Sequence, residues 1–219
     1  MTPREAVIAN IEFAAGDGRI GYNFTGVEGR LNDFTGAGCA HGFQAEEWQE
    51  GGFDYYTDIW GNTWYRKTGL SKGGEVYAPV LPQWRDLDRL ELPDLDNPAY
   101  YEAARQLGAS GTALFRVGWL AGFPFAICRY MRKMEIYFAD LIEHREQVDA
   151  LHDRVTTLLE GVMDRYGEAG MDGVMFCEDL GTQERLLMSP RMWRDIFRPL
   201  YERLCSRAHR YGMKVIQHS

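Results

Sequence analysis

The chain has 219 residues, of which 24 are Lys or Arg and 32 are Asp or Glu, so its formal net charge is −8. Hydrophobic residues make up 45% and charged residues 26%, fractions typical of a globular domain rather than a disordered tail or a fibre. The acidic balance argues against a nucleic-acid-binding protein, which needs clustered Lys and Arg side chains. No apolar run approaches the roughly 20 residues that cross a bilayer. The N-terminus also lacks an apolar signal core, so we expect a cytoplasmic protein.

The cysteines favour the same compartment. Cys39, Cys128, Cys177 and Cys205 form no C-x-x-C pair, so this spacing indicates neither a zinc ribbon nor a redox motif. We expect them to be reduced thiols.

The N-terminal half mixes helical and strand patterns. Thr2, Pro3 and Glu5 are typical of a helix N-terminus, and the helix should continue to about Phe13. Residues 20–24 indicate a first short strand. The other elements expected in this half are a Gly-rich loop at 26–42, a short helix at 43–49, strands within 53–67 that break at Gly61, and a surface segment at 81–97 with one short helix.

From about residue 97 the pattern becomes regular. Pro199 should kink or split the helix that contains it. The expected helices are 97–107, 124–133, 134–144, 146–169 and 189–211. The expected strands are 112–118, a buried run at 173–177, and a short strand at 214–218. Strands that alternate with helices in this way indicate an α/β fold with a parallel sheet.

The number of strand-helix units points to an incomplete barrel. Units near residues 20, 55, 112, 173 and 214 give about five, whereas a (β/α)8 barrel has eight. We therefore predict a partial TIM barrel, with 1–219 as a single incomplete domain. The chain looks C-terminally truncated, because its last strand has no helix to cover it.

In parallel α/β folds, ligands meet the C-terminal ends of the strands. Polar or aromatic residues at or just after the predicted strand ends are Asn23, Thr25, Asp58, Trp119, Glu178, Asp179 and His218. Glu178 and Asp179 could share a cavity, where mutual repulsion raises one pKa and one carboxyl serves as acid, base or metal ligand. The alternative is that Asp179 caps the next turn and Glu178 is solvated.

The remaining candidates are each open to a structural interpretation. Asp58 either acts in the site or caps the turn before Gly61. His218 is either a ligand or a structural histidine, and Tyr130 either binds a ligand or packs in the core. His41, in a predicted loop, could reach the site. The chain contains no G-x-G-x-x-G after its first strand, no P-loop and no G-x-S-x-G, so dinucleotide, P-loop and serine-hydrolase chemistry are unsupported.

Several blocks of the sequence resemble the uroporphyrinogen decarboxylase family. The blocks are Glu178–Gln183, Met188–Trp193, Phe197–Leu200, His209, Gly212–Val215 and His218, with weaker similarity at Met1–Glu5 and Asp58–Gly61. The resemblance spans the whole chain and is strongest over 112–219. It implies a (β/α)8 barrel with its site at the strand C-termini. It also implies one of two activities: cofactor-free decarboxylation of uroporphyrinogen III, or zinc-dependent methyl transfer involving a corrinoid protein or cobamide.

The decarboxylase branch matches only in part. Asp58 falls where the family has its aspartate, and Tyr130 falls where it has its tyrosine, after Gly122-Phe123-Pro124. Asp179 replaces the family's serine. The arginine-rich stretch that grips the substrate's eight carboxylates is missing, since Arg19 and Arg30 are the only arginines between 19 and 45. A role in porphyrin and haem biosynthesis therefore remains the alternative.

The methyltransferase branch matches better. Its metal ligands begin with H-x-C-G at the end of the fifth strand, and His218-Ser219 starts such a pattern. The resemblance implies zinc in the full-length protein but not in this chain, with His218 as a ligand and a corrinoid on a partner as the methyl carrier. Asp58, Glu178 and Asp179 would be the catalytic residues.

The resemblance leaves the substrate and the oligomeric state open. Tyr130, Asn23 and Trp119 are the residues predicted to contact substrate, which would be a small methylated molecule or a tetrapyrrole. A homodimer is an open alternative, whereas nucleic acid and membranes are not expected partners. A third alternative is an inactive fragment that associates through its exposed sheet edge.

Overall fold

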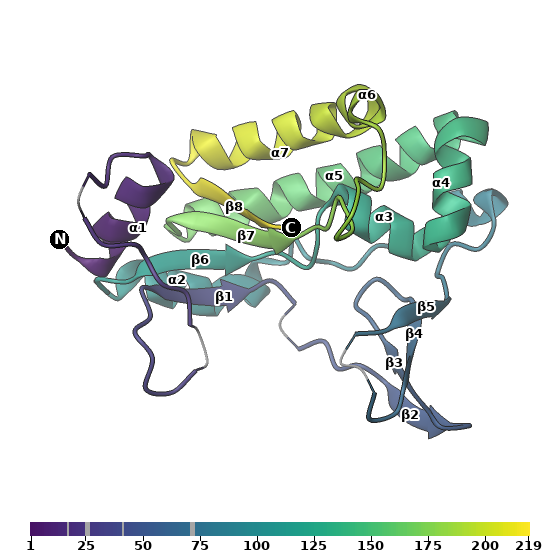
Figure 1. The fold of residues 1–219 in the computed structure, drawn as a ribbon, viewed down its shortest axis with the longest axis horizontal. Coiled ribbons are helices and arrows are strands. Elements are labelled where there is room, and N and C mark those ends of the chain that lie inside the picture. Colours follow the sequence, from purple (N-terminus) through teal and green to yellow (C-terminus); the bar gives the residue numbers. More distant parts are fainter. Residues whose placement is uncertain (17, 25–26, 41, 71–72) are drawn as a thin grey trace.

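The computed structural model describes residues 1–16, 18–24, 27–40, 42–70 and 73–219, and its centre is a parallel sheet (Figure 1). The strands β1 (Phe34–Gly38), β6 (Phe115–Trp119), β7 (Gly173–Cys177) and β8 (Lys214–His218) lie in the order β1-β6-β7-β8 and are all parallel. The predicted α/β class with a parallel sheet and helices is confirmed. This sheet is open over the described residues.

Helices cover one face of the sheet. They are α2 (Glu102–Ala109), α3 (Pro124–Arg132), α4 (Met134–Glu143), α5 (Arg145–Glu168) and α7 (Arg198–Arg210). Helix α5 buries a stripe at helical spacing, which includes Val148, Leu151, Val155, Leu159 and Val162. This stripe joins Val174 and Phe176 of β7 in the larger apolar core. The central strands are therefore fixed by burial against α5 and its neighbours.

The opposite face, here called the inner face, is covered by a helix near the start of the strands. There α1 (Pro3–Ile11) packs Val7 against Phe34, Phe115 and Val117. Met175 and Ile216 belong to the same face. Side chains alternate along a strand, so residues two positions further on share that face. The inner face therefore carries Trp119, Cys177 and His218 at the C-terminal ends of three strands.

A second sheet is antiparallel and stands apart from the first (Figure 1). Its strands β2 (Glu47–Glu50), β3 (Phe53–Thr57), β4 (Thr63–Lys67) and β5 (Glu75–Ala78) follow one another in order. The strands predicted within 53–67 are confirmed, but they form a hairpin and are not a strand of the barrel. The helix predicted at 43–49 is wrong, because Glu47–Glu50 pairs with β3 instead.

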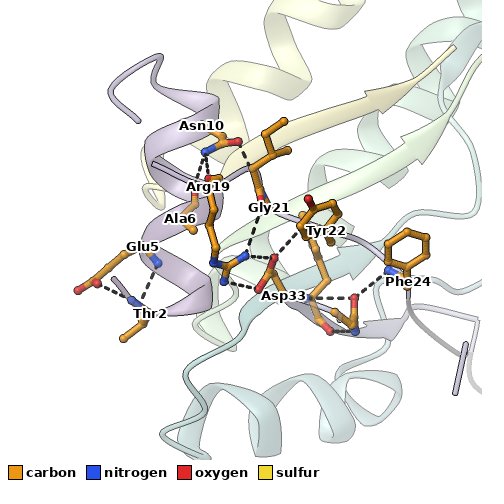
Figure 2. Close-up of polar contacts among 12 residues, drawn as sticks. Thr2, Glu5, Ala6, Asn10, Arg19, Gly21, Tyr22, Phe24 and Asp33 are labelled. Atoms are coloured by element: carbon orange, nitrogen blue, oxygen red, sulfur yellow. Dashed lines mark hydrogen bonds and ion pairs between the residues drawn. The ribbon is translucent and has the colours of Figure 1, made fainter. Parts of the chain in front are cut away.

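The strand predicted at 20–24 is also wrong, and the first barrel strand lies at Phe34–Gly38, inside the segment predicted as a loop. Figure 2 shows what holds residues 19–22 instead: the buried Asp33 carboxylate accepts hydrogen bonds from both terminal nitrogens of Arg19 (2.7 and 2.6 Å) and from the backbone N–H of Tyr22 (2.7 Å). The N–H of Tyr22 is therefore bonded to a side chain and not to a neighbouring strand. Over the described residues, the parallel sheet has four strands where five were predicted, because the unit near residue 55 lies in the antiparallel sheet.

The other predicted elements are present. The Thr2–Glu5 capping box starts α1 (Figure 2), and the short helix after Pro82 is a 3-10 helix at Trp84–Arg89. The helix around Pro199 is split, as predicted, into α6 (Pro190–Met192), a π-helical turn (Trp193–Phe197) and α7. A 3-10 turn (Pro98–Tyr101) leads into α2. Within the described part of the chain, no helix has the length and apolar character needed to cross a membrane.

Tyr166 of α5 joins the helices to two strands. Its hydroxyl lies 3.0 Å from the carbonyl oxygen of Ala37, the second-last residue of β1, and 2.9 Å from that of Trp119, the last residue of β6. The ring occupies the space left by Gly118, where a Cβ atom would lie 2.6 Å from it. This contact anchors the C-terminal ends of both strands to the helix layer.

We predict that Tyr166→Phe lowers the free energy of unfolding by about 1–3 kcal/mol, because the buried carbonyl groups lose a hydrogen-bond donor. Urea denaturation measures the change, with the exposed Tyr77→Phe as the control. Equal stability of the two variants would contradict the anchoring role.

Candidate active site

A thiol and an imidazole lie on neighbouring strands at the C-terminal edge of the sheet. Cys177 ends β7 and His218 ends β8, and the two residues are paired in the parallel register. Register partners in a parallel sheet point to the same face, which here is the inner face. Both residues are exposed. His218 was predicted from the sequence and Cys177 was not. The strand-end rule applies equally to Cys177, because it is the last residue of its predicted strand.

Trp119 and Asn23, two predicted substrate contacts, lie on the same side of the sheet. Trp119 ends β6, and its indole fills the space above Gly36, where a Cβ atom would lie 2.4 Å from its Nε1. Asn23 is exposed, and its Nδ2 atom lies 4.0 Å from the sulfur of Met175. These residues border the Cys177–His218 edge and form one wall of a candidate site.

Glu178, the residue directly after β7, points the other way and is buried at 1% exposure. Its Oε1 atom accepts a hydrogen bond from the backbone N–H of Ala126 (2.8 Å), at the start of α3, and its Oε2 atom accepts one from the Tyr201 hydroxyl of α7. Its own N–H donates to the His218 carbonyl oxygen (2.9 Å), and Gln217 Nε2 donates to its carbonyl oxygen (3.2 Å). Glu178 therefore links the β7–β8 edge to two helices.

Burial raises the pKa of Glu178 from its ordinary value of 4.5 to about 7. The hydrogen bonds from Tyr201 and Ala126, and the positive charge of Arg129, oppose this shift. A helix N-terminus also favours a negative charge. The carboxyl group therefore gains or loses its proton near neutral pH. Such a pKa suits a group that takes up or releases a proton.

The structure separates the two adjacent carboxylates. Asp179 is exposed, whereas Glu178 is enclosed by α3 and α7. The expectation of a shared cavity is wrong, and so is the alternative of a solvated Glu178. The reason is the alternation of side chains at the end of a strand, which sends neighbouring residues to opposite sides.

Asp58 and Tyr130 meet around the ring of Trp64. Asp58 accepts hydrogen bonds from the N–H groups of Trp60 (3.0 Å) and Asn62 (2.9 Å), from Asn62 Nδ2 (2.9 Å) and from Trp64 Nε1 (2.6 Å). Tyr130 packs edge-on against the same indole at 4.6 Å. Asp58 thus caps the turn between β3 and β4, the structural alternative raised by the sequence.

Two predicted positions remain, Thr25 and His41, together with the groups that could hold a metal ion. Thr25 and His41 lie outside the described residues. Over the residues that the structure does describe, no group of three or more His, Cys, Asp or Glu side chains is placed to hold a metal ion. Cys177 and His218 are donors of the kind that zinc prefers, but a zinc site needs three or four protein ligands. These two side chains are fewer than such a site needs.

Comparisons with known proteins identify the family. The model described as Uroporphyrinogen decarboxylase (URO-D) matches residues 67–219, and the chain therefore belongs to this family, as its sequence motifs predicted. No curated protein matches it. A solved structure of a methyltransferase from Methanosarcina mazei shares the fold, with a TM-score of 0.56 and 17% identity over 73% of this chain and 47% of that one. The chain thus spans about half the length of that methyltransferase.

The raised pKa of Glu178 predicts a distinct dependence of stability on pH. The folded protein holds this proton more tightly than the unfolded chain, so the stabilisation is complete below about pH 4.5 and is lost as the pH rises through about 7. The shift corresponds to about 3 kcal/mol.

The test is urea denaturation between pH 4 and 8. We expect Glu178→Gln to remove this part of the pH slope, while the neighbouring exposed carboxylate variant Asp179→Asn keeps it. The same slope in the wild type and in Glu178→Gln would show that Glu178 has an ordinary pKa.

Proposed function

We propose that this chain is part of a methyltransferase of the uroporphyrinogen decarboxylase family that works with zinc and exchanges methyl groups with a corrinoid protein or a cobamide. The observation that carries the proposal is the pairing of Cys177 with His218 at the C-terminal edge of the sheet. This edge is where parallel α/β folds place their reactive groups. The shared fold with a methyltransferase supports the proposal.

Cys177 and His218 would hold the zinc together with ligands from beyond the chain described here. When bound, zinc lowers the pKa of a thiol and so makes it a nucleophile for a methyl group. Trp119 would form the wall of the site, with Asn23 at its border. These residues lie on the open inner face, where a flat corrinoid or a thiol substrate has access.

Glu178 would act as a positioning residue rather than touch the substrate. It bonds to the backbone of His218 and is fastened by Tyr201 and Ala126. Through these bonds it sets the relative position of the two strand ends that carry Cys177 and His218. Its burial in the helix layer keeps its charge away from the substrate.

We expect a protein extended beyond Ser219 to contain zinc and to transfer the methyl group of methylcobalamin to 2-mercaptoethanol. Cys177→Ala and His218→Ala should each lower zinc affinity by about tenfold or more, with a matching loss of rate, because each removes a ligand. Elemental analysis and the absorbance of methylcobalamin give the two readouts.

The exposed His209→Ala is the matched control and should keep both properties. Full zinc content and full rate in both ligand variants would overturn the assignment of these two residues.

Decarboxylation of uroporphyrinogen is the second candidate, and the arrangement of Asp58 and Tyr130 around Trp64 is the observation in its favour. Two observations weigh against it. The Asp58 carboxylate is already engaged by four hydrogen bonds within its own turn. Arg19, one of the two arginines between residues 19 and 45, is paired with Asp33.

We expect the extended protein to leave uroporphyrinogen III unchanged under anaerobic conditions. We also expect Asp58→Asn to lower the free energy of unfolding by about 1–3 kcal/mol, because an amide nitrogen replaces an acceptor facing several N–H donors. Chromatography of the porphyrins and urea denaturation are the measurements. Consumption of uroporphyrinogen that stops in a folded Asp58→Asn variant would favour the decarboxylase instead.

A further inference from the structure

A cavity of about 370 Å³ lies between the antiparallel sheet and the junction of α3 with α4. Its walls come from β4, β5 and the two helices, and the residues that matter here are Trp64, Val76, Arg129, Tyr130, Lys133 and Met134. Small-molecule sites fall in this range of volumes and combine apolar walls with a few polar groups. The cavity is separate from the Cys177–His218 edge, since none of its lining residues belongs to β7 or β8.

Arg129 is the unusual member of this wall. It is 7% exposed, yet no carboxylate of the described residues lies within ion-pair distance of its guanidinium. Its Nε atom has no hydrogen-bond partner. The contacts that the guanidinium does make are with the Tyr130 hydroxyl (2.9 Å) and with the ring faces of Phe125 and Tyr130, each centred 4.8 Å away.

A second arginine on the same helix shows what a satisfied buried arginine looks like here. Arg132 is 4% exposed and bonds to the Asp140 carboxylate (2.8 Å) and to the Leu81 carbonyl oxygen (2.6 Å). Its guanidinium also packs on the Trp84 ring. Burying a charge is unfavourable unless a counter-charge accompanies it. Arg132 has that counter-charge in direct contact. Arg129 has no carboxylate of the described residues within ion-pair distance, although its charge acts on Glu178 and opposes the rise in the pKa of that carboxyl. The Arg129 guanidinium therefore has no anion bonded to it and can receive one.

The other charges around the cavity leave Arg129 as the anion-binding group. Lys133 is paired with Glu135 at 3.4 Å, and Glu75 is exposed at the rim. Arg129 is the most buried charged residue of the wall. An anion that reached it would be partly desolvated, which strengthens a charge-assisted hydrogen bond.

The other residues of the cavity wall determine which kind of molecule could bear the anionic group. The Trp64 and Tyr130 rings meet edge-on at 4.6 Å, and Val76 and Met134 add aliphatic surface. Flat apolar walls of this kind favour a flat apolar body over a strongly hydrated ion. We propose that this cavity binds a small organic carboxylate with a flat apolar body, with the carboxylate on Arg129. The proposal concerns binding and does not depend on the methyl transfer proposed above.

Calorimetric titration of the purified chain with benzoate tests the proposal, with benzyl alcohol and inorganic phosphate as comparison probes. We expect saturable binding of benzoate, with benzyl alcohol and phosphate each at least about tenfold weaker, because one lacks the charge and the other lacks the apolar body. Arg129→Gln should weaken benzoate by about tenfold or more.

A second variant covers the case in which Arg129→Gln fails to fold. Met134 is 37% exposed and lines the cavity, so Met134→Trp should fill its mouth and weaken benzoate to a similar extent while leaving Arg129 in place. Ile136→Trp, at a similarly exposed position of α4 outside the cavity, is the matched control and should bind as the wild type does. Absence of saturable benzoate binding, tighter binding of phosphate, or full binding by Met134→Trp would overturn the proposal.

Discussion

The buried carboxyl group of Glu178 is the contact on which the candidate site depends. It receives hydrogen bonds from the start of α3 and from α7, while its backbone continues the ladder between β7 and β8. One residue thereby fixes two helices relative to the strand ends that carry Cys177 and His218. A buried carboxylate is stabilised only while its hydrogen-bond donors remain in place. Any displacement of α3 or α7 would therefore alter the position of this edge of the sheet.

Two consecutive residues at the end of β7 have different roles, one facing the candidate site and the other holding the strand end in place. Cys177 is exposed on the inner face, and Glu178 is enclosed on the opposite side. Alternation alone produces this division. It allows the exposed edge to stay accessible to ligands while the carboxyl group that positions it is kept from solvent, and burial is also what raises the pKa of that group.

The sequence predicted the fold well from about residue 97 onward and less well before it, for identifiable reasons. Strands β6 and β7 are largely apolar segments, β8 contains the β-branched pair Val215-Ile216, and α5 repeats apolar residues at helical spacing, so local patterns suffice. Strand β1 has the sequence Phe-Thr-Gly-Ala-Gly, which looks like a loop because the Trp119 indole requires Gly36 to lack a side chain. All residues of β2 are exposed, so it has no buried face to produce an alternation.

The candidate site shows a similar limit. The strand-end rule selected Glu178, Trp119 and His218 correctly as residues at the edge of the sheet, because their positions follow from the chain alone. The pairing of Cys177 with His218 depends on strand order, which local patterns do not contain. Arg129 and Arg132 show the same dependence on tertiary structure. They are the same residue type, three positions apart on one buried helix, and only the tertiary placement of Asp140 makes one an internal ion pair and leaves the other open to a ligand. The functional difference between two such residues lies in what surrounds them, so it can be recognised only after the fold is known.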